Sequence, residues 1–282
     1  MNPLPSKPDP AVSPVTRRWR VAAVQMVSTP RIDENLTVAA RLIADAVTQG
    51  ARLVLLPEYF PIMGLSERDK VARREVDGDG EIQCFLASTA REWGIWLIGG
   101  SLPLVASQPD KVFNSCLVYD PQGRRVARYD KIHLFGFQQG AERYDESVTI
   151  EAGRQPVAFD TPAGRVGLSI CYDLRFPELY RTLGSVSLLV VPSAFTETTG
   201  RAHWEILLRA RAIENQCYVL AAAQGGVHEN GRETHGNSLL IDPWGTIIDR
   251  KAKGPGVVVG DLDPATLAEV RSALPALQHR VL

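Results

Sequence analysis

Short apolar runs alternate with amphipathic helical patterns along most of this chain, and no other sequence feature restricts the fold as much. An apolar run at residues 19–26 is followed by a helical pattern at 32–50 and by a second apolar run at 51–58. Apolar residues that recur at i, i+3 and i+4 predict a helix, whereas a short apolar run between turn residues predicts a buried strand. The alternation therefore predicts an α/β fold.

The remaining sequence continues this pattern and adds hairpins. We predict further helices at residues 82–94, 177–183 and 201–216, and further strands at 95–105, 186–194 and 217–224. Turn residues between paired apolar runs predict hairpins at 111–131, 156–171 and 235–249. Since hairpins join antiparallel strands and helical crossovers join parallel ones, we expect a sandwich of mixed sheets.

The first 19 residues differ in composition from the rest. They contain prolines at positions 3, 5, 8, 10 and 14 and almost no aliphatic run, which predicts a flexible Pro-rich tail. Residues 20–282 contain no proline-rich or low-complexity linker. We therefore predict a single domain over 20–282, large enough to bury a sizeable core.

Composition and charge exclude several classes of partner. With 45% hydrophobic residues, 22% charged residues and a net charge of -1, the chain has no basic excess to neutralise phosphates, so we expect neither nucleic acid nor a membrane surface as partner. No run of about 18 apolar residues predicts a membrane span. The 4 cysteines are dispersed without a C-x-x-C pair, which predicts neither a metal site nor disulfides and favours the cytoplasm.

Cys171 stands where an apolar run ends, just before the helical segment that follows Pro177. Backbone N–H groups at such a position create positive potential that favours a thiolate, so Cys171 is a candidate nucleophile. The alternative is a small apolar core residue, as most free cysteines are. We expect that core role for Cys84, Cys116 and Cys217, which lie inside a predicted helix or strand.

Two charged residues, like Cys171, stand at the end of a predicted strand. Glu58 follows the run "RLVLLP", and Lys131 ends "RRVARYD". Either could be a solvated strand end. However, ligands of α/β proteins gather beyond the carboxyl ends of strands, so the three residues could meet at one sheet edge. None of the 5 histidines is singled out by its neighbours, and none has the spacing of a metal site.

The segments "LLPE", "YDKIHLF" and "ICYDLRFPELYR", in this order, closely resemble the nitrilase, or carbon–nitrogen hydrolase, superfamily. The resemblance extends over roughly residues 20–282 and implies a four-layer α-β-β-α sandwich. It also implies a Glu–Lys–Cys triad, which falls on Glu58, Lys131 and Cys171, and no cofactor. Family members commonly pair through the helix after the nucleophile, so a homodimer through 177–183 is expected.

The resemblance also implies a mechanism. Glu58 would take the thiol proton while Cys171 attacks an amide carbonyl, and Lys131 with the backbone N–H of Tyr172 would stabilise the oxyanion before a thioester forms. Many members carry a second glutamate that positions the substrate. The "ES" at 146–147 favours Glu146, and Glu142 is the alternative.

The residues around and after the cysteine indicate a branch of the family. "CYDLRFPELYR" resembles the ω-amidase and deaminated glutathione amidase branches, and "AAAQGGVH" followed by "HGNSLLIDPWG" is closest to the second. The expected substrate is thus the amide of a small metabolite. Alternative substrates are α-ketoglutaramate and an N-carbamoyl amide. An alternative function is that of a catalytically silent binding or scaffold protein. Arg175 could bind a substrate carboxylate, or could pair with Glu178 or a neighbouring subunit.

Overall fold

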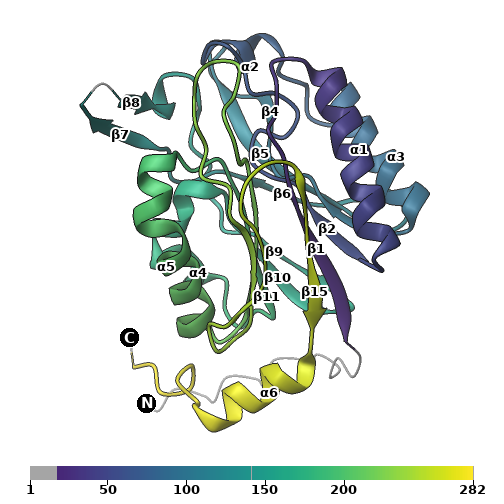
Figure 1. The fold of residues 1–282 in the computed structure, drawn as a ribbon, viewed down its shortest axis with the longest axis vertical. Helices are drawn as coiled ribbons and strands as arrows, with labels where there is room; N and C mark the ends of the chain where they lie inside the picture. The colour runs from purple at the N-terminus through teal and green to yellow at the C-terminus, as the bar shows by residue number, and fades with distance from the viewer. Residues whose placement is uncertain (1–17, 141, 282) are drawn as a thin grey trace, which may run out of the picture.

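The computed structural model describes residues 18–140 and 142–281 as two β-sheets packed face to face, with helices on both outer sides (Figure 1). The expected four-layer α-β-β-α sandwich is confirmed. Most of the predicted tail lies outside the described residues, and the first strand already begins at Trp19. No helix in the described part of the chain is long and apolar enough to cross a membrane.

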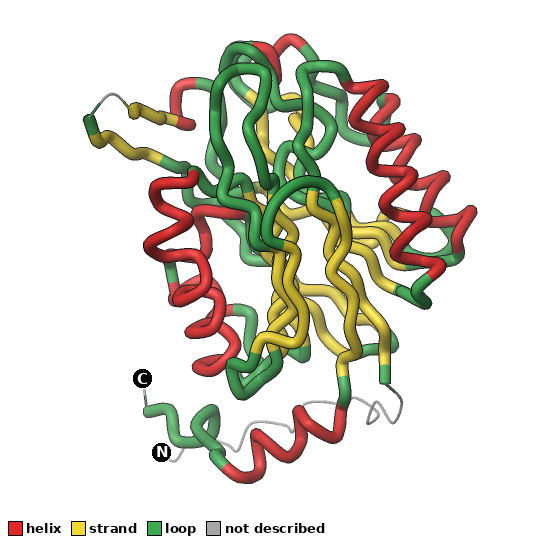
Figure 2. Tube along the Cα trace, in the orientation of Figure 1, coloured by secondary structure: helices red, strands yellow, loops and turns green. Residues whose placement is uncertain are grey.

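The first sheet has seven strands in the order β15-β1-β2-β3-β5-β4, with β6 paired to β5. They are β1 (Trp19–Gln25), β2 (Leu53–Leu55), β3 (Trp96–Ile98), β4 (Leu102–Val105), β5 (Val112–Tyr119), β6 (Arg125–Asp130) and β15 (Gly256–Leu262). β1, β2 and β3 are parallel, and β15 runs antiparallel to β1. Helices α1 (Ile32–Thr48) and α3 (Glu81–Trp93) cover its outer face (Figure 2).

The second sheet has six strands in the order β14-β13-β12-β11-β10-β9. They are β9 (Ala158–Thr161), β10 (Gly164–Leu168), β11 (Leu188–Ser193), β12 (Tyr218–Ala223), β13 (Ser238–Ile241) and β14 (Ile247–Lys251). Helices α4 (Pro177–Thr182) and α5 (Glu197–Asn215) lie on its outer side (Figure 1). The remaining elements are α2 (Asp69–Ala72), hairpin strands β7 (Gly136–Gln139) and β8 (Glu142–Asp145), α6 (Pro264–Ala273), and two short 3-10 helices, η1 (Glu146–Val148) and η2 (Cys171–Arg175).

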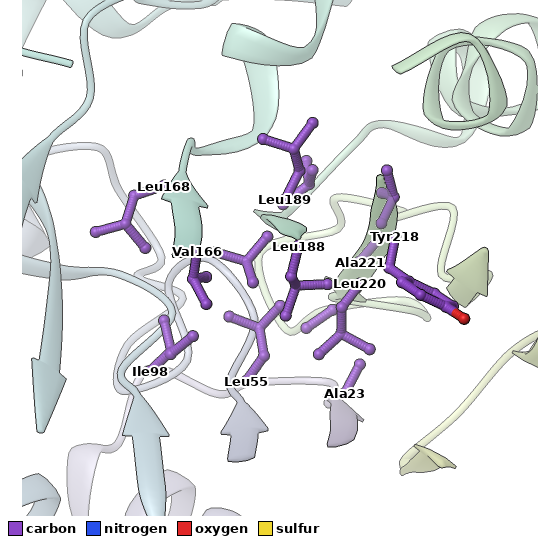
Figure 3. Close-up of a cluster of buried hydrophobic side chains, with 14 of the residues drawn as sticks. Ala23, Leu55, Ile98, Val166, Leu168, Leu188, Leu189, Tyr218, Leu220 and Ala221 are labelled. Carbon is purple, nitrogen blue, oxygen red and sulfur yellow. The ribbon is translucent and has the colours of Figure 1, made fainter. Parts of the chain in front are cut away.

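The main core lies between the two sheets (Figure 3). Successive side chains of a strand point to opposite faces, so Val21 and Ala23 of β1 pack in this core while Ala22 and Val24 pack under α1 and α3. Both faces of β1 are therefore buried, which explains why its sequence reads as a continuous apolar run rather than an alternating one.

The structure confirms the predicted hairpin turns and corrects other expectations. The single strand expected at 95–105 is two strands, β3 and β4, separated by residues 99–101. Strand β15 and helix α6 were missed. The expected core position of Cys84 is wrong: α3 buries Ile82, Leu86 and Ala90, and Cys84 is exposed on another side of the helix.

The carboxyl ends of the parallel strands of both sheets meet at one end of the sandwich. Met26, just after β1, forms a parallel bridge with Gln224, just after β12. The Gln224 amide also donates to the backbone oxygen of Glu58, at 3.0 Å. Residues that follow strands of different sheets are thereby brought to the same place.

Candidate active site

Glu58, Lys131 and Cys171 come together at this end of the sandwich. Glu58 follows β2, Lys131 follows β6 directly, and Cys171 begins a 3-10 turn after β10. The Lys131 Nζ atom lies 2.8 Å from Glu58 Oε1, and both side chains are almost fully buried. Cys171 is 7% exposed, and the carboxylate of Glu58 lies close enough to act on its thiol. The three strand ends, two from the first sheet and one from the second, lie together, and none of the three is a solvated end.

Cys171 has a backbone conformation that few residues with side chains adopt. Its φ is +49°, in the left-handed region, which costs on the order of 1–3 kcal/mol and persists only where neighbours impose it. Asp173 supplies that constraint, because its carboxylate accepts from the Ile170 N–H at 2.8 Å and the Tyr129 hydroxyl at 2.6 Å. The same carboxylate accepts from the backbone N–H of His133 at 3.0 Å. Sequence reasoning missed Asp173, although it lies within the cysteine motif.

Lys131 also binds a second carboxylate, which belongs to one of the two candidate glutamates. Its Nζ atom lies 2.8 and 3.0 Å from the two carboxylate oxygens of Glu146. Glu142 instead lies in β8, paired with Gln139 across the hairpin. Of the two glutamates, only Glu146 therefore belongs to the buried cluster, because the hairpin carries Glu142 away from it.

Lys131 and Glu146 hold each other in the charged form. Burial alone would lower the pKa of Lys131, but the carboxylates of Glu146 and Glu58 outweigh it and raise that pKa above its ordinary value. Burial alone would raise the pKa of Glu146, but the ammonium of Lys131 lowers it. The pair thus keeps the ammonium of Lys131 and the carboxylate of Glu146 charged at neutral pH.

Each oxygen of Glu58 has a defined partner. Oε1 accepts from the Asn114 amide at 3.0 Å as well as from Lys131, and Oε2 accepts from the backbone N–H of Ala194 at 2.9 Å. Ala194 follows β11 of the second sheet, so the carboxylate connects the two sheets. This fixes its orientation toward Cys171.

The thiol of Cys171 is held in its neutral form. Burial, the negative charge of Glu58 and the hydrogen bond to Glu58 raise its pKa well above the ordinary value, and Lys131 only partly offsets them. This direction is opposite to the expectation of a resting thiolate. The backbone dipoles invoked for it are outweighed by burial and by a carboxylate that the cysteine segment alone does not reveal.

A pocket opens over Cys171. Aromatic, hydroxyl and cationic side chains line it, together with Ala194 and the carboxylate of Glu146: Phe135, Tyr172, Arg175, Phe195, Thr196, Thr199 and Arg232. Both Tyr172 and Arg175 were predicted from the sequence, whereas Arg232 was missed because no motif marked it.

Arg175 has no carboxylate partner within the described ranges. Its Nη1 group donates to Nδ1 of His203 at 3.2 Å, and its guanidinium lies 5.2 Å from the centre of the Phe195 ring. The expected alternative pairing with Glu178 is not formed. Trp204, beside His203 in α5, is buried in the core.

Among residues 18–140 and 142–281, no group of three or more His, Cys, Asp or Glu side chains is arranged to hold a metal ion.

The comparison with family sequence models decides the family. The model of the Carbon-nitrogen hydrolase family matches residues 20–272. The chain belongs to this family. A carbon–nitrogen hydrolase of this kind is a cysteine-dependent amidohydrolase that acts on small-molecule amides, so the expected reaction class is confirmed.

Relatives of this carbon–nitrogen hydrolase cover nearly its whole length. A deaminated glutathione amidase of Synechocystis is 44% identical over 93% of this chain and 98% of its own. The mouse protein of the same name is 39% identical over 98% of this chain and 88% of its own. Among solved structures, a Saccharomyces cerevisiae member of branch 10 of the nitrilase superfamily has a TM-score of 0.85 at 29% identity, covering 96% of this chain and 100% of that one.

Proposed function

We propose that this protein is a deaminated glutathione amidase. It would hydrolyse the amide between the α-ketoglutaryl group and the cysteinylglycine dipeptide, releasing α-ketoglutarate and the dipeptide. Relatives of that name at 39–44% identity support the substrate. The observation that carries the mechanism is that the ion pair of Glu58 and Lys131 is buried next to Cys171, which lines the pocket.

The first half of the reaction uses Glu58 as general base. Because the Cys171 thiol is neutral at rest, its proton passes to Glu58 as sulfur attacks the amide carbonyl carbon. The carbonyl oxygen becomes an oxyanion, which accepts hydrogen bonds from the ammonium of Lys131 and the backbone N–H of Tyr172. One such donor contributes roughly 3 kcal/mol to transition-state stabilisation.

The second half returns the proton and releases the acid. Glu58 protonates the departing amine as the carbon–nitrogen bond breaks, leaving a thioester on Cys171. Water then enters, Glu58 removes its proton, and hydroxide attacks the thioester carbonyl. The carbon–sulfur bond breaks, the thiol is reprotonated by Glu58, and the carboxylic acid leaves. No cofactor enters this scheme.

Two further residues have supporting roles in the proposal. Glu146 keeps the ammonium of Lys131 in place through the 2.8 Å and 3.0 Å contacts. Arg175 binds a substrate carboxylate, because its guanidinium lines the pocket and is without an acidic partner in the described part of the chain.

The decisive experiment compares two substrates at matched concentrations. We expect the purified protein to release α-ketoglutarate without ammonia from deaminated glutathione, with a much higher kcat/KM than for α-ketoglutaramate. A preference for α-ketoglutaramate, with ammonia released, would make the protein an ω-amidase instead. The Cys171→Ala variant is the control, and amide hydrolysis by that variant would contradict the mechanism.

We further propose a homodimer in a reducing compartment such as the cytoplasm. All 4 cysteines are free, as a reducing compartment would keep them. Helix α5, which packs beside the predicted contact helix α4, exposes 70% of Ile206 and 49% of Ile213, an apolar surface that a second copy could cover. Light scattering that gives the mass of one 30.9 kDa chain would contradict the dimer.

A further inference from the structure

A second guanidinium group, that of Arg232, faces the same pocket as Cys171. Arg232 lies in the loop between β12 and β13, far in sequence from the cysteine motif. It lines the pocket over Cys171 and also the adjoining hollow next to Glu146 and Tyr144. The pocket therefore carries two arginines, Arg175 and Arg232.

Arg232 is held in place but lacks a counter-ion. Its Nη2 group donates to the backbone oxygen of Ala194 at 2.6 Å, and its guanidinium lies 5.1 Å from the centre of the Tyr144 ring. Its Nε–H group is buried and has no acceptor. Within residues 18–140 and 142–281, no acidic side chain forms an ion pair with it.

Arg31 differs in this respect, because on the surface it pairs with two carboxylates, those of Glu34 and Glu229. A half-buried cation with an unused, buried donor is unfavourable unless an anion arrives to pair with it. Guanidinium groups suit carboxylates especially well, because their donors match both oxygens at once.

The anchoring of Arg232 connects it to the reacting groups. Ala194, whose backbone oxygen accepts from Arg232, also supplies the backbone N–H that donates to Glu58 Oε2 at 2.9 Å. The backbone N–H of Arg232 is fixed in turn by the side chain of Asn230, at 2.9 Å. The guanidinium is therefore positioned relative to Glu58 before any substrate binds, as binding sites of high specificity require.

We propose that Arg232 binds a carboxylate of the amide substrate through its Nε–H and adjacent N–H groups, and so selects acids over neutral amides. This rests on the proposed function, which it deepens. Deaminated glutathione carries one carboxylate on the acyl side of the scissile amide and another on the leaving dipeptide. Two arginines in one pocket match two carboxylates, and the experiment identifies which one Arg232 binds.

The test combines an arginine variant with three amides. The variant Arg232→Met removes the charge while keeping most of the length, and Arg232→Lys keeps the charge. Arg201→Met is the matched control, since Arg201 lies on the exposed side of α5 with an 80% exposed side chain. The amides are α-ketoglutaryl-cysteinylglycine, its C-terminal glycinamide, and 4-oxopentanoyl-cysteinylglycine, which lacks the acyl-side carboxylate.

We expect Arg232→Met to raise KM for the diacid about tenfold or more while kcat changes little, because a hydrogen-bonded charge pair is lost. Arg232→Lys should lose less, and Arg201→Met should behave as the wild type. The effect of Arg232→Met should disappear on the one amide that lacks the bound carboxylate. An equal loss on all three amides, or a fall confined to kcat, would show that Arg232 only supports Ala194 and would overturn the proposal.

The outcome is separable from failure of the proposed function. If the wild type hydrolyses none of the three amides, the proposed function fails alone. Calorimetric binding of α-ketoglutarate and of cysteinylglycine to the Cys171→Ala protein then tests Arg232. Binding of either that is lost on adding Arg232→Met supports the carboxylate site, whereas unchanged binding, or none at all, overturns it.

Discussion

Lys131 lies between two chemically identical carboxylates, those of Glu58 and Glu146, whose surroundings differ. Glu58, on one side, lies between the sheets at 1% exposure and contacts Asn114, Ala194 and the Cys171 thiol. Glu146, on the other side, is 8% exposed and lines the pocket. It accepts from the Tyr59 hydroxyl and from the backbone N–H of Phe135, both at 2.7 Å.

This difference assigns the two carboxylates different tasks in the proposed mechanism. A general base must lie within hydrogen-bond reach of the proton that it takes. Glu58 meets this condition for the proton of the Cys171 thiol. No contact of the described residues places Glu146 within that reach. The oxygens of Glu146 are occupied by Tyr59, Phe135 and Lys131, so its charge serves to hold the ammonium. In the proposed mechanism Glu58 therefore carries the proton, whereas Glu146 only holds Lys131 in place.

The largest effect is expected on the Glu58 side. Glu58→Gln keeps the shape of the side chain but removes the base, so kcat should fall by about 10³-fold or more, near the upper range for general acid–base catalysis. Steady-state kinetics on deaminated glutathione measures this, with circular dichroism as the control for folding. Activity within tenfold of the wild type would show that another group is the general base. The proposed difference between Glu58 and Glu146 would then be wrong.

A smaller effect is expected on the Glu146 side. Glu146→Gln leaves Glu58 and Cys171 intact but weakens the hold on Lys131, and a displaced group of this kind costs roughly a hundredfold. We therefore expect kcat to fall by about 10²-fold, clearly less than for Glu58→Gln. If the two variants lose the same activity, the two carboxylates act as one unit and the proposed division is wrong.

The smallest expected effect is a rise rather than a fall in rate, and it concerns alkylation of the Cys171 thiol. Because the raised pKa of Cys171 keeps it neutral, alkylation by iodoacetamide should be slow at pH 8 and should rise as pH approaches that pKa. Glu58→Gln removes a negative charge that raises this pKa, so the profile should shift to lower pH and alkylation at pH 8 should speed up about tenfold. Glu146→Gln should shift it less, since the charge of Glu146 has the weaker influence.

The alkylation rates are read from the mass of the modified peptide, with the exposed Cys84 as an internal reference. A Glu58→Gln protein that loses turnover yet alkylates faster has lost its base and kept its nucleophile. Slower alkylation in Glu58→Gln would mean that Glu58 promotes the thiolate at rest, contrary to the neutral thiol described above.

The fold was predictable where the signal was local. Apolar runs and helical periodicity located β1, α1 and α3 within a few residues, because burial of a regular element imposes a regular pattern. Strand β15 was missed although it pairs with β1 over its whole length, since "GVVVGDL" has no turn signal to a sequence neighbour. Its partner lies more than 200 residues away, and only the tertiary fold brings it there.

The sequence by itself determined which residues the chemistry can use. Glu58 and Cys171 each follow an apolar run and Lys131 ends a predicted hairpin strand, and a strand end is recognisable without knowing its partners. The tertiary structure decided what surrounds them: that Glu146 and not Glu142 contacts Lys131, that Asp173 fixes the cysteine turn, and that Arg232 faces the pocket. It also decided the protonation of the thiol, because a pKa depends on burial and on charges a few ångströms away, and distance in space cannot be read from distance along the chain.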